Sequence, residues 1–419
     1  MKGYQFEDTQ GTFHLKKAEN ISYLYFPIAG EAGLKSSLTP NLGGDAKIDQ
    51  NTFLLEPVSA ENLVNNRNSR NFWCNVKGIG SWSLTGNAAE ALSKKFTEMQ
   101  DDSEVTAGFM WQKTTRESKK YQLRGEILSF IPVEKNVEVM LVTITNTGRM
   151  AQTVTPTAAI PLYGRSADNI RDHRHVTSLL HRIETTDTGV LVTPTLSFDE
   201  RGHQVNHMTY YCVGWSGNGE KPVDFYPTAE DFVGEGGNFE RPYAIVKKAE
   251  GVKAGTRIEG LEAVGGLHFS EVTLEPEEEC SYLIFTGITE DIQEIRNLSK
   301  TYTTREMVLE ELEKTKAYWQ EKVNVAYHTG DSDFNQFMHW VSFQPILRRI
   351  YGCSFLPHHD YGKGGRGWRD LWQDCLALLI MNPDGVRQML LDNFAGVRVD
   401  GSNATIIGSK QGEFVADRN

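Results

Sequence analysis

The sequence of 419 residues has no stretch of about 18 apolar residues, so it predicts no membrane-spanning helix. Its first eight residues, Met-Lys-Gly-Tyr-Gln-Phe-Glu-Asp, contain no apolar core, and we expect no signal peptide. The five cysteines are scattered and form no C-x-x-C pair, which favours reduced thiols over a disulfide framework or a zinc site. Together these absences predict a cytoplasmic protein with no membrane partner.

Basic residues are fewer than acidic ones. The chain has 43 Lys and Arg against 55 Asp and Glu, a net charge of −12, which argues against nucleic acid or an anionic membrane as a partner. A local basic pocket for an anion stays compatible with this balance. The hydrophobic content of 39% and charged content of 23% are typical of a globular protein, and the length predicts two or three domains.

The first part of the chain, residues 1–287, reads as strands and turns. Residues 137–145 alternate as a strand closed by Asn146-Thr-Gly148, and residues 153–160 are predicted to pair with it. Glycine, proline and asparagine interrupt the apolar segments at short spacing, and helical periodicity is scarce. This pattern predicts a large antiparallel β-sandwich domain.

Helices follow. Residues 288–328 predict a helical linker, with a short helix over 291–299 and a capping box in which Thr303 and Glu306 bond each other's backbone. Residues 329–419 read as helices alone, and Pro345 is expected to kink or end the first of them. About 90 residues supply only three or four helices, so we expect the chain to break off inside this second domain.

The segment that suggests chemistry opens this helical domain. Residues 361–367 contain four glycines, and a run of arginine, tryptophan, acidic and amide side chains follows before the apolar residues 376–381. On a helix beginning near Trp368, Asp370 and Asp374 share one face, and Arg369 and Gln373 lie beside them. No Walker Lys-Ser/Thr pair follows the glycines, which excludes a nucleotide P-loop. The six candidate substrate-binding residues are Arg366, Trp368, Arg369, Asp370, Gln373 and Asp374.

Two interpretations fit this segment. Carboxylates accept hydrogen bonds from sugar hydroxyls, arginine and glutamine donate them, and tryptophan covers the apolar face of a sugar ring. The alternative is a capped helix end with Arg–Asp ion pairs. The density of polar and aromatic groups beside a glycine-rich loop favours the sugar-binding interpretation.

Three further polar stretches are ambiguous. The loop 41–45 is read as a hairpin connection rather than a ligand loop, and residues 65–73 could line a carbohydrate or simply precede a strand. His173, His175 and His181 are read as structural or interface residues, because no carboxylate–cysteine set accompanies them to hold a metal.

The order of sandwich, helical linker, glycine-rich loop and Arg369-Asp370-x-x-Gln373-Asp374 resembles the cellobiose phosphorylase type of enzyme, family 94 of the glycoside hydrolases. The sequence segments at residues 26–33 and 69–73 resemble the branch of this family that acts on β-1,2-linked oligoglucans. The resemblance covers the whole chain. It implies a β-sandwich joined by linker helices to an (α/α)6 barrel, of which this chain would hold the first helices, and a homodimer.

The resemblance further implies a hexosyltransferase that splits a β-linked glucan or disaccharide with inorganic phosphate as co-substrate and needs no other cofactor. Phosphate attacks the anomeric carbon, an aspartic acid protonates the leaving oxygen, and inverted α-glucose 1-phosphate results. By resemblance Arg369 and Asp370 bind the transferred glucose, while the general acid is expected beyond Asn419, so no residue here is assigned as catalytic. Left open are an inverting hydrolase or glycosyl-transferring enzyme on the same scaffold, and a non-catalytic carbohydrate-binding protein.

Overall fold

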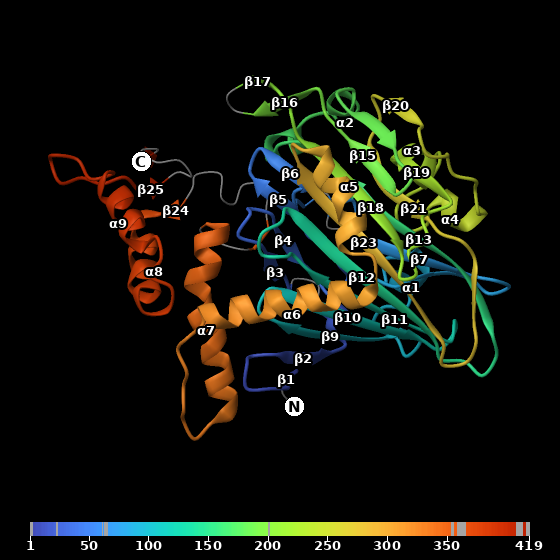
Figure 1. Cartoon of the computed structure of the whole chain (residues 1–419), viewed down its shortest axis with the longest axis horizontal. Coiled ribbons are helices and arrows are strands. Elements are labelled where there is room, and N and C mark those ends of the chain that lie inside the picture. Colours follow the sequence, from blue (N-terminus) through green and yellow to red (C-terminus); the bar gives the residue numbers. More distant parts are fainter. Residues whose placement is uncertain are drawn as a thin grey trace.

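The computed structural model describes residues 3–21, 24–60, 62, 66–199, 202–352, 356–357, 366–407 and 414–415. Over these residues the chain forms a two-layered antiparallel sandwich followed by helices, as the sequence predicts (Figure 1). No helix in this part of the chain has the length and apolar character needed to cross a bilayer.

The larger layer of the sandwich is an eleven-stranded sheet. Its strands, in spatial order, are β1 (Tyr4–Phe6), β2 (Phe13–Lys16), β9 (Asp102–Gly108), β10 (Trp111–Ser118), β11 (Leu123–Phe130), β12 (Val137–Asn146), β23 (Glu279–Thr289), β18 (Thr209–Ser216), β15 (Gly189–Val192), β14 (Arg182–Thr185) and β20 (Arg257–Glu259).

The second layer is a six-stranded sheet, and a four-stranded sheet lies beside it. The six strands are β19 (Asp224–Thr228), β21 (Ala263–His268), β13 (Gln152–Leu162), β7 (Asn71–Val76), β8 (Gly80–Ser83) and β22 (Val272–Leu274), which pairs with β13. The four strands are β3 (Phe26–Ala29), β4 (Lys35–Leu38), β5 (Ala46–Asp49) and β6 (Thr52–Leu55). Two smaller pairings are the hairpin β16 (Leu196–Asp199) with β17 (Gly202–Val205), and β24 (Arg366–Gly367), β25 (Ile406–Ile407) and β26 (Phe414–Val415). The last three strands lie in the region that the sequence predicts to be helical alone, so that prediction is wrong for these residues.

The described helices comprise four single-turn segments in the sandwich and five longer ones after it. They are α1 (Ala89–Ser93), α2 (Arg174–Ser178), α3 (Ala229–Val233), α4 (Tyr243–Lys247), α5 (Ile292–Thr301), α6 (Arg305–Lys322), α7 (Ser332–Tyr351), α8 (Trp368–Met381) and α9 (Val386–Phe394).

One predicted strand pairing is wrong. β12 is fully buried and pairs with β11 and β23, whereas β13 pairs with β7, β21 and β22 in the other sheet. The turn at Asn146–Gly148 therefore carries the chain from one layer to the other. Each strand is the central member of its own sheet, and both layers contribute to one apolar core between them, which includes Val142, Ile144 and Val154.

Two helical predictions also need correction. α6 begins at Arg305 with Thr304 as its N-cap, and the hydroxyl of Thr303 contacts the sulfur of Met307, so the predicted Thr303–Glu306 capping box does not form. α7 runs unbroken through Pro345. Proline leaves the carbonyl of Val341 without its helical partner, but Val341 is exposed, where water can replace that bond. Phe343, Ile346 and Leu347 pack in the core on either side of the proline and stabilise the helix across it, so Pro345 does not end α7.

The helices attach to the sandwich at two places. α5 and α6 cover the outer face of the large sheet, where Leu298, Tyr302 and Leu312 join a core with residues of β12, β18 and β23 (Figure 1). α7 is fixed to the first strands: Trp340 Nε1 donates to the carbonyl of Gly11 over 2.8 Å, and Arg349 binds the carboxylate of Glu31. This attachment sets where α8 and the predicted sugar-binding residues begin.

Candidate sugar-binding site

The predicted sugar-binding segment does begin a helix, and the glycine at its start lies close to the Asp370 carboxylate. α8 begins at Trp368, with Gly367 as its N-cap, and β24 pairs Arg366 and Gly367 with β25. A Cβ at position 367 would lie only 2.6 Å from Oδ2 of Asp370. The missing side chain therefore leaves room for the Asp370 carboxylate in the first turn of α8, where the helix dipole stabilises a negative charge.

Arg369 and Asp370 form the polar edge of this helix start. A guanidinium nitrogen of Arg369 lies 3.5 Å from Oδ1 of Asp370, and the two side chains are 83% and 48% exposed. Gln373, one turn further on, is also exposed. The three side chains present donors and acceptors to the same solvent-facing side, which is the combination that neighbouring sugar hydroxyls require. At this exposure the Arg369–Asp370 pair itself adds little to stability.

The aromatic residues pack against α9. Trp368 lies edge-on to Trp372 with ring centroids 5.8 Å apart, and Trp372 contacts Phe394 at 4.6 Å. Trp368 Nε1 donates to the carbonyl of Asn393 over 3.2 Å. This hydrogen bond fixes the orientation of the Trp368 indole, which stays partly exposed. The predicted stacking of Trp368 on a sugar ring stays a prediction.

Asp374 lies differently from the other candidates. Its side chain is 5% exposed and accepts hydrogen bonds from Arg348 of α7, with both carboxylate oxygens 2.8 Å from Nε. The carboxylate that the sequence places on the face of Asp370 thus joins α7 to α8. Its predicted contact with sugar stays a prediction, and the ion pair makes Asp374 a positioning residue for the helix start.

Arg348 is the residue that the sequence interpretation missed. Basic side chains at 348 and 349 in the last turn of α7 read as ordinary helix-end charges. Instead each makes a specific ion pair, Arg348 with Asp374 and Arg349 with Glu31. The glycine-rich residues 361–365 and the side chain of Arg366 lie outside the described residues.

The other polar stretches belong to the sandwich. Residues 39–45 connect β4 to β5, so the hairpin interpretation is confirmed, and Gly44 is required there because a Cβ would lie 1.7 Å from the carbonyl oxygen of Ser37. Arg70, just before β7, is buried against Glu138 at 2.9 Å. His181 is buried, while His173 and His175 lie exposed at α2 with ring centroids 5.4 Å apart. Among the described residues no group of three His, Cys, Asp or Glu side chains could hold a metal ion.

A wide sandwich leads through the linker helices α5 and α6 and then α7 to α8, which begins with Trp368, Arg369 and Asp370. Residues 57–305 match the supersandwich domain of glycosyl hydrolase 94, which is more than half of the chain, and the chain belongs to this family. The match ends inside α6, so it covers most of the sandwich and α5 and stops before α8.

One relative by sequence is the cyclic beta-(1,2)-glucan synthase NdvB of Rhizobium meliloti (strain 1021), 27% identical over 203 residues. The match covers 45% of this chain, and the chain spans only 6% of the length of that relative.

Two solved structures share parts of the fold at low scores. A bacterial glucoamylase complexed with acarbose has a TM-score of 0.45 at 10% identity, over 96% of this chain and 52% of its own. A putative aldose 1-epimerase of Escherichia coli K12 has a TM-score of 0.33 at 10% identity, over 64% of this chain and 99% of its own. Neither likeness is close enough to bear on what this chain does.

Proposed function

We propose that this chain belongs to an inverting glycoside phosphorylase and supplies, at the start of α8, the groups that bind the glucose unit to be transferred. The observation that supports this most directly is the arrangement of Arg369 and Asp370, which lie 3.5 Å apart and open to solvent on a helix start anchored by Asp374 and Arg348. Family membership supports the proposed reaction class.

In the proposed reaction, inorganic phosphate attacks the anomeric carbon of a β-linked terminal glucose from the face opposite the glycosidic oxygen. The C–O bond to the leaving sugar breaks, an aspartic acid gives that oxygen a proton, and the products are α-glucose 1-phosphate and a shortened acceptor. Phosphate arrives already anionic, so no carboxylate base is needed to activate water, in contrast to an inverting hydrolase. Asp370 and Arg369 would hold the glucose hydroxyls so that the anomeric carbon faces the phosphate.

The proposed substrate is a β-1,2-linked glucan or its disaccharide. The sequence phrases at residues 26–33 and 69–73 resemble the branch acting on such glucans. The relative NdvB is, by its name, a synthase of cyclic β-1,2-glucan, and its match to this chain supports the same linkage.

The test is product formation by the full-length enzyme from β-1,2-oligoglucan, with and without inorganic phosphate. We expect α-glucose 1-phosphate only when phosphate is present. Free glucose released equally with and without phosphate would identify a hydrolase and overturn the proposal. For the 419-residue chain alone we expect no product, because by resemblance the general acid is not among its residues.

Asp370→Asn tests the role of the helix start. It keeps the size of the side chain but exchanges two acceptors for an acceptor and a donor, so kcat/KM should fall at least about 100-fold, or about 3 kcal/mol of transition-state stabilisation. The matched control is Asp384→Asn, an exposed aspartate between α8 and α9, which should retain normal kinetics. Near-normal turnover by Asp370→Asn would remove Asp370 from the sugar site.

A further inference from the structure

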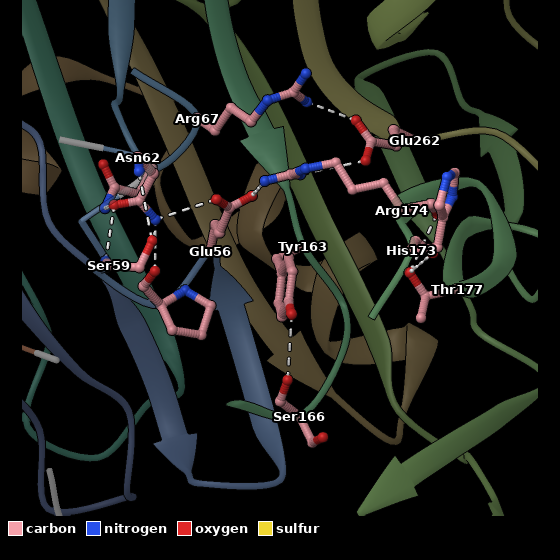
Figure 2. Close-up of polar contacts among 12 residues, drawn as sticks. Glu56, Ser59, Asn62, Arg67, Tyr163, Ser166, His173, Arg174, Thr177 and Glu262 are labelled. Atoms are coloured by element: carbon pink, nitrogen blue, oxygen red, sulfur yellow. Dashed lines mark hydrogen bonds and ion pairs between the residues drawn. The ribbon is translucent and has the colours of Figure 1, made fainter. Parts of the chain in front are cut away.

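A second polar site lies within the sandwich, where β13 and β21 approach the end of β6. A pocket of about 300 Å³, counting the space at its mouth, is lined by Glu56, Arg67, Arg165, Arg174 and Glu262, with Tyr163 and Phe239 as aromatic walls. Figure 2 shows four of the charged side chains pointing toward one another from separate segments. Both the location and the residues differ from those of α8.

Four of these side chains form one chain of ion pairs (Figure 2). Arg67 donates to Glu262 over 2.6 Å, Arg174 donates to Glu262 over 3.2 Å and to Glu56 over 2.5 Å, and Glu56 also accepts from Asn62 over 3.1 Å. The two carboxylates are thus occupied by two arginines. Burial raises the pKa of Glu262, but the charges of Arg67, Arg174 and Arg165 outweigh it and hold this pKa below its ordinary value, so the carboxylate stays ionised.

The fifth charged side chain, Arg165, has no such partner. It is 6% exposed, and its Nε donates over 3.4 Å to Nε2 of His181, whose Nδ1 lies 3.1 Å from the carbonyl of Leu261. Burial, and then the charge of Arg165, lower the pKa of His181 to about 3, so the imidazole is neutral and accepts this bond without compensating the guanidinium charge. Within the described residues, neither terminal guanidinium nitrogen of Arg165 has a hydrogen-bond partner.

The backbone fixes Arg165 in this position. Gly164 precedes it with a φ of +61°, which turns the chain at the end of β13, and Phe53 of β6 donates its backbone N–H to the carbonyl of Arg165 over 3.0 Å. The guanidinium carbon lies 5.1 Å from the centre of the Tyr163 ring. The side chain is therefore held between an aromatic face and a neutral imidazole, and its free nitrogens line the pocket.

The charges at the pocket leave one positive charge uncompensated: three arginines face two carboxylates. A buried ionised group without a counter-charge is costly, and arginine presents its paired N–H groups in the geometry that an oxyanion accepts. In a protein with a net charge of −12, a local surplus of positive charge is unexpected unless a bound anion compensates it.

We propose that this pocket is an oxyanion-binding site in which Arg165 donates two hydrogen bonds to a phosphate or carboxylate group of a small ligand. Arg67 and Arg174, each paired with a carboxylate, border the site, while Tyr163 and Phe239 limit its width. In this proposal the oxyanion enters from the mouth of the pocket, and the rest of a larger ligand, such as a sugar bearing that group, stays at the surface. The site does not depend on the proposed function of α8.

The experiment is isothermal titration of the 419-residue chain with inorganic phosphate, α-glucose 1-phosphate and glucuronate, and with glucose as the neutral comparison. We expect one site per chain for at least one anion and no binding of glucose. The anion with the highest affinity identifies the source of the oxyanion. Arg165→Met should lower that affinity at least tenfold.

Arg116→Met is the matched control, because Arg116 is also buried but is paired with Glu19 outside this pocket. It should bind the anion within threefold of the unaltered chain. If Arg165→Met fails to fold, Arg165→Lys, which keeps the charge but loses the paired donors, should weaken binding severalfold. The thermal midpoint of the unaltered chain should also rise with the anion and not with equal ionic strength of sodium chloride. No binding of any of the three anions, or affinity unchanged in Arg165→Met, would overturn the site.

Discussion

At the residue scale, helical periodicity in the sequence predicted which side chains share a face of α8. It did not predict which residues of another helix these side chains contact. Asp370 and Asp374 share a face of α8 because they are four apart, and that much follows from helical periodicity. The partner of Asp374 is Arg348, 26 residues earlier on α7, and only the packing of α7 against α8 brings them together. Gly367 is one glycine among several in the sequence, and only the structure shows that a Cβ there would displace the Asp370 carboxylate.

Arg348→Met should destabilise the helical part of the protein. It leaves the buried carboxylate of Asp374 without its cation, which we expect to cost about 2 to 3 kcal/mol, less than for a fully buried pair because Arg348 is 41% exposed. Urea denaturation followed by tryptophan fluorescence measures the change. The double variant Arg348→Met/Asp374→Leu should recover at least half of the loss, and a double variant as unstable as the sum of the two single changes would contradict a direct interaction.

Gly367→Ala should weaken sugar binding while leaving the fold intact. The new methyl group would meet Oδ2 of Asp370 and displace the carboxylate from its present position. We expect the affinity for a β-1,2-linked disaccharide, measured by titration calorimetry, to fall about tenfold. Gly330→Ala is the control, since nothing lies within 4 Å of a Cβ at that position, and it should bind as the unaltered chain does.

At the scale of elements, the hydrophobic pattern of the sequence predicted which segments form strands and which form helices. It did not predict how the strands pair. The period-two segments at 137–145 and 153–160 are strands as predicted, yet the chain turns between layers there instead of forming a hairpin. Local sequence cannot distinguish a hairpin from a turn between layers, because both strands contain many apolar residues. Each strand forms its backbone hydrogen bonds with strands that are distant in the sequence. Pro345 shows the same limit, since packing on both sides of it outweighs its local preference to end a helix.

The attachment of α7 to the sandwich should depend on pH through Glu31. Burial raises the pKa of this carboxyl, but hydrogen bonds from Arg349 and Tyr318 outweigh it, and the folded-state pKa lies below the ordinary value. When folding lowers the pKa of a carboxyl group, its charge stabilises the folded state at pH values above the pKa of the unfolded state. This stabilisation is lost as the pH falls through the pKa of the folded state. We therefore expect Glu31→Gln to cost about 0.5 to 1 kcal/mol at pH 7 and less at about pH 3.

Chemical denaturation at the two pH values measures this difference. Glu313→Gln is the comparison, because Glu313 is 68% exposed and pairs only with Lys316 along α6. It should change stability little at either pH. An effect of Glu31→Gln that is equal at both pH values would show that its charge does not stabilise α7.

At the scale of the whole molecule, the sequence predicted the sandwich followed by helices, and the structure has it. The predicted domain boundaries at residues 287 and 328 stay a prediction. In the structure β23 ends at Thr289 and α7 begins at Ser332. The oxyanion pocket was out of reach because its charged residues come from separate stretches between Glu56 and Glu262. Such sites become visible only when the topology brings distant segments to one end of the sandwich.

The helices after the sandwich leave apolar side chains open to solvent. Leu376 and Ile380 of α8 are 67% and 70% exposed, and Phe337 of α7 is 54% exposed. Exposed apolar surface of this kind promotes association. We expect the purified 419-residue chain to self-associate with rising concentration in light scattering coupled to size-exclusion chromatography.

Leu376→Lys/Ile380→Glu should shift that association to higher concentration without changing the circular dichroism of the sandwich. The comparison is Met150→Lys, which alters an exposed side chain of the sandwich and should leave association unchanged. A chain that stays monomeric at all concentrations, or an equal effect of both changes, would contradict a role for the α8 surface.

The contact between Trp340 and Gly11 joins residues 329 positions apart, and it has a consequence for biosynthesis. At about 5 to 20 residues per second, a ribosome reaches Trp340 roughly 15 to 65 seconds after Gly11. During that interval the aromatic rings of Phe13 and Phe26, which pack against Trp340 in the finished protein, lack that neighbour. We therefore expect the segment around Phe13 and Phe26 to stay incompletely packed during synthesis until Trp340 has been made.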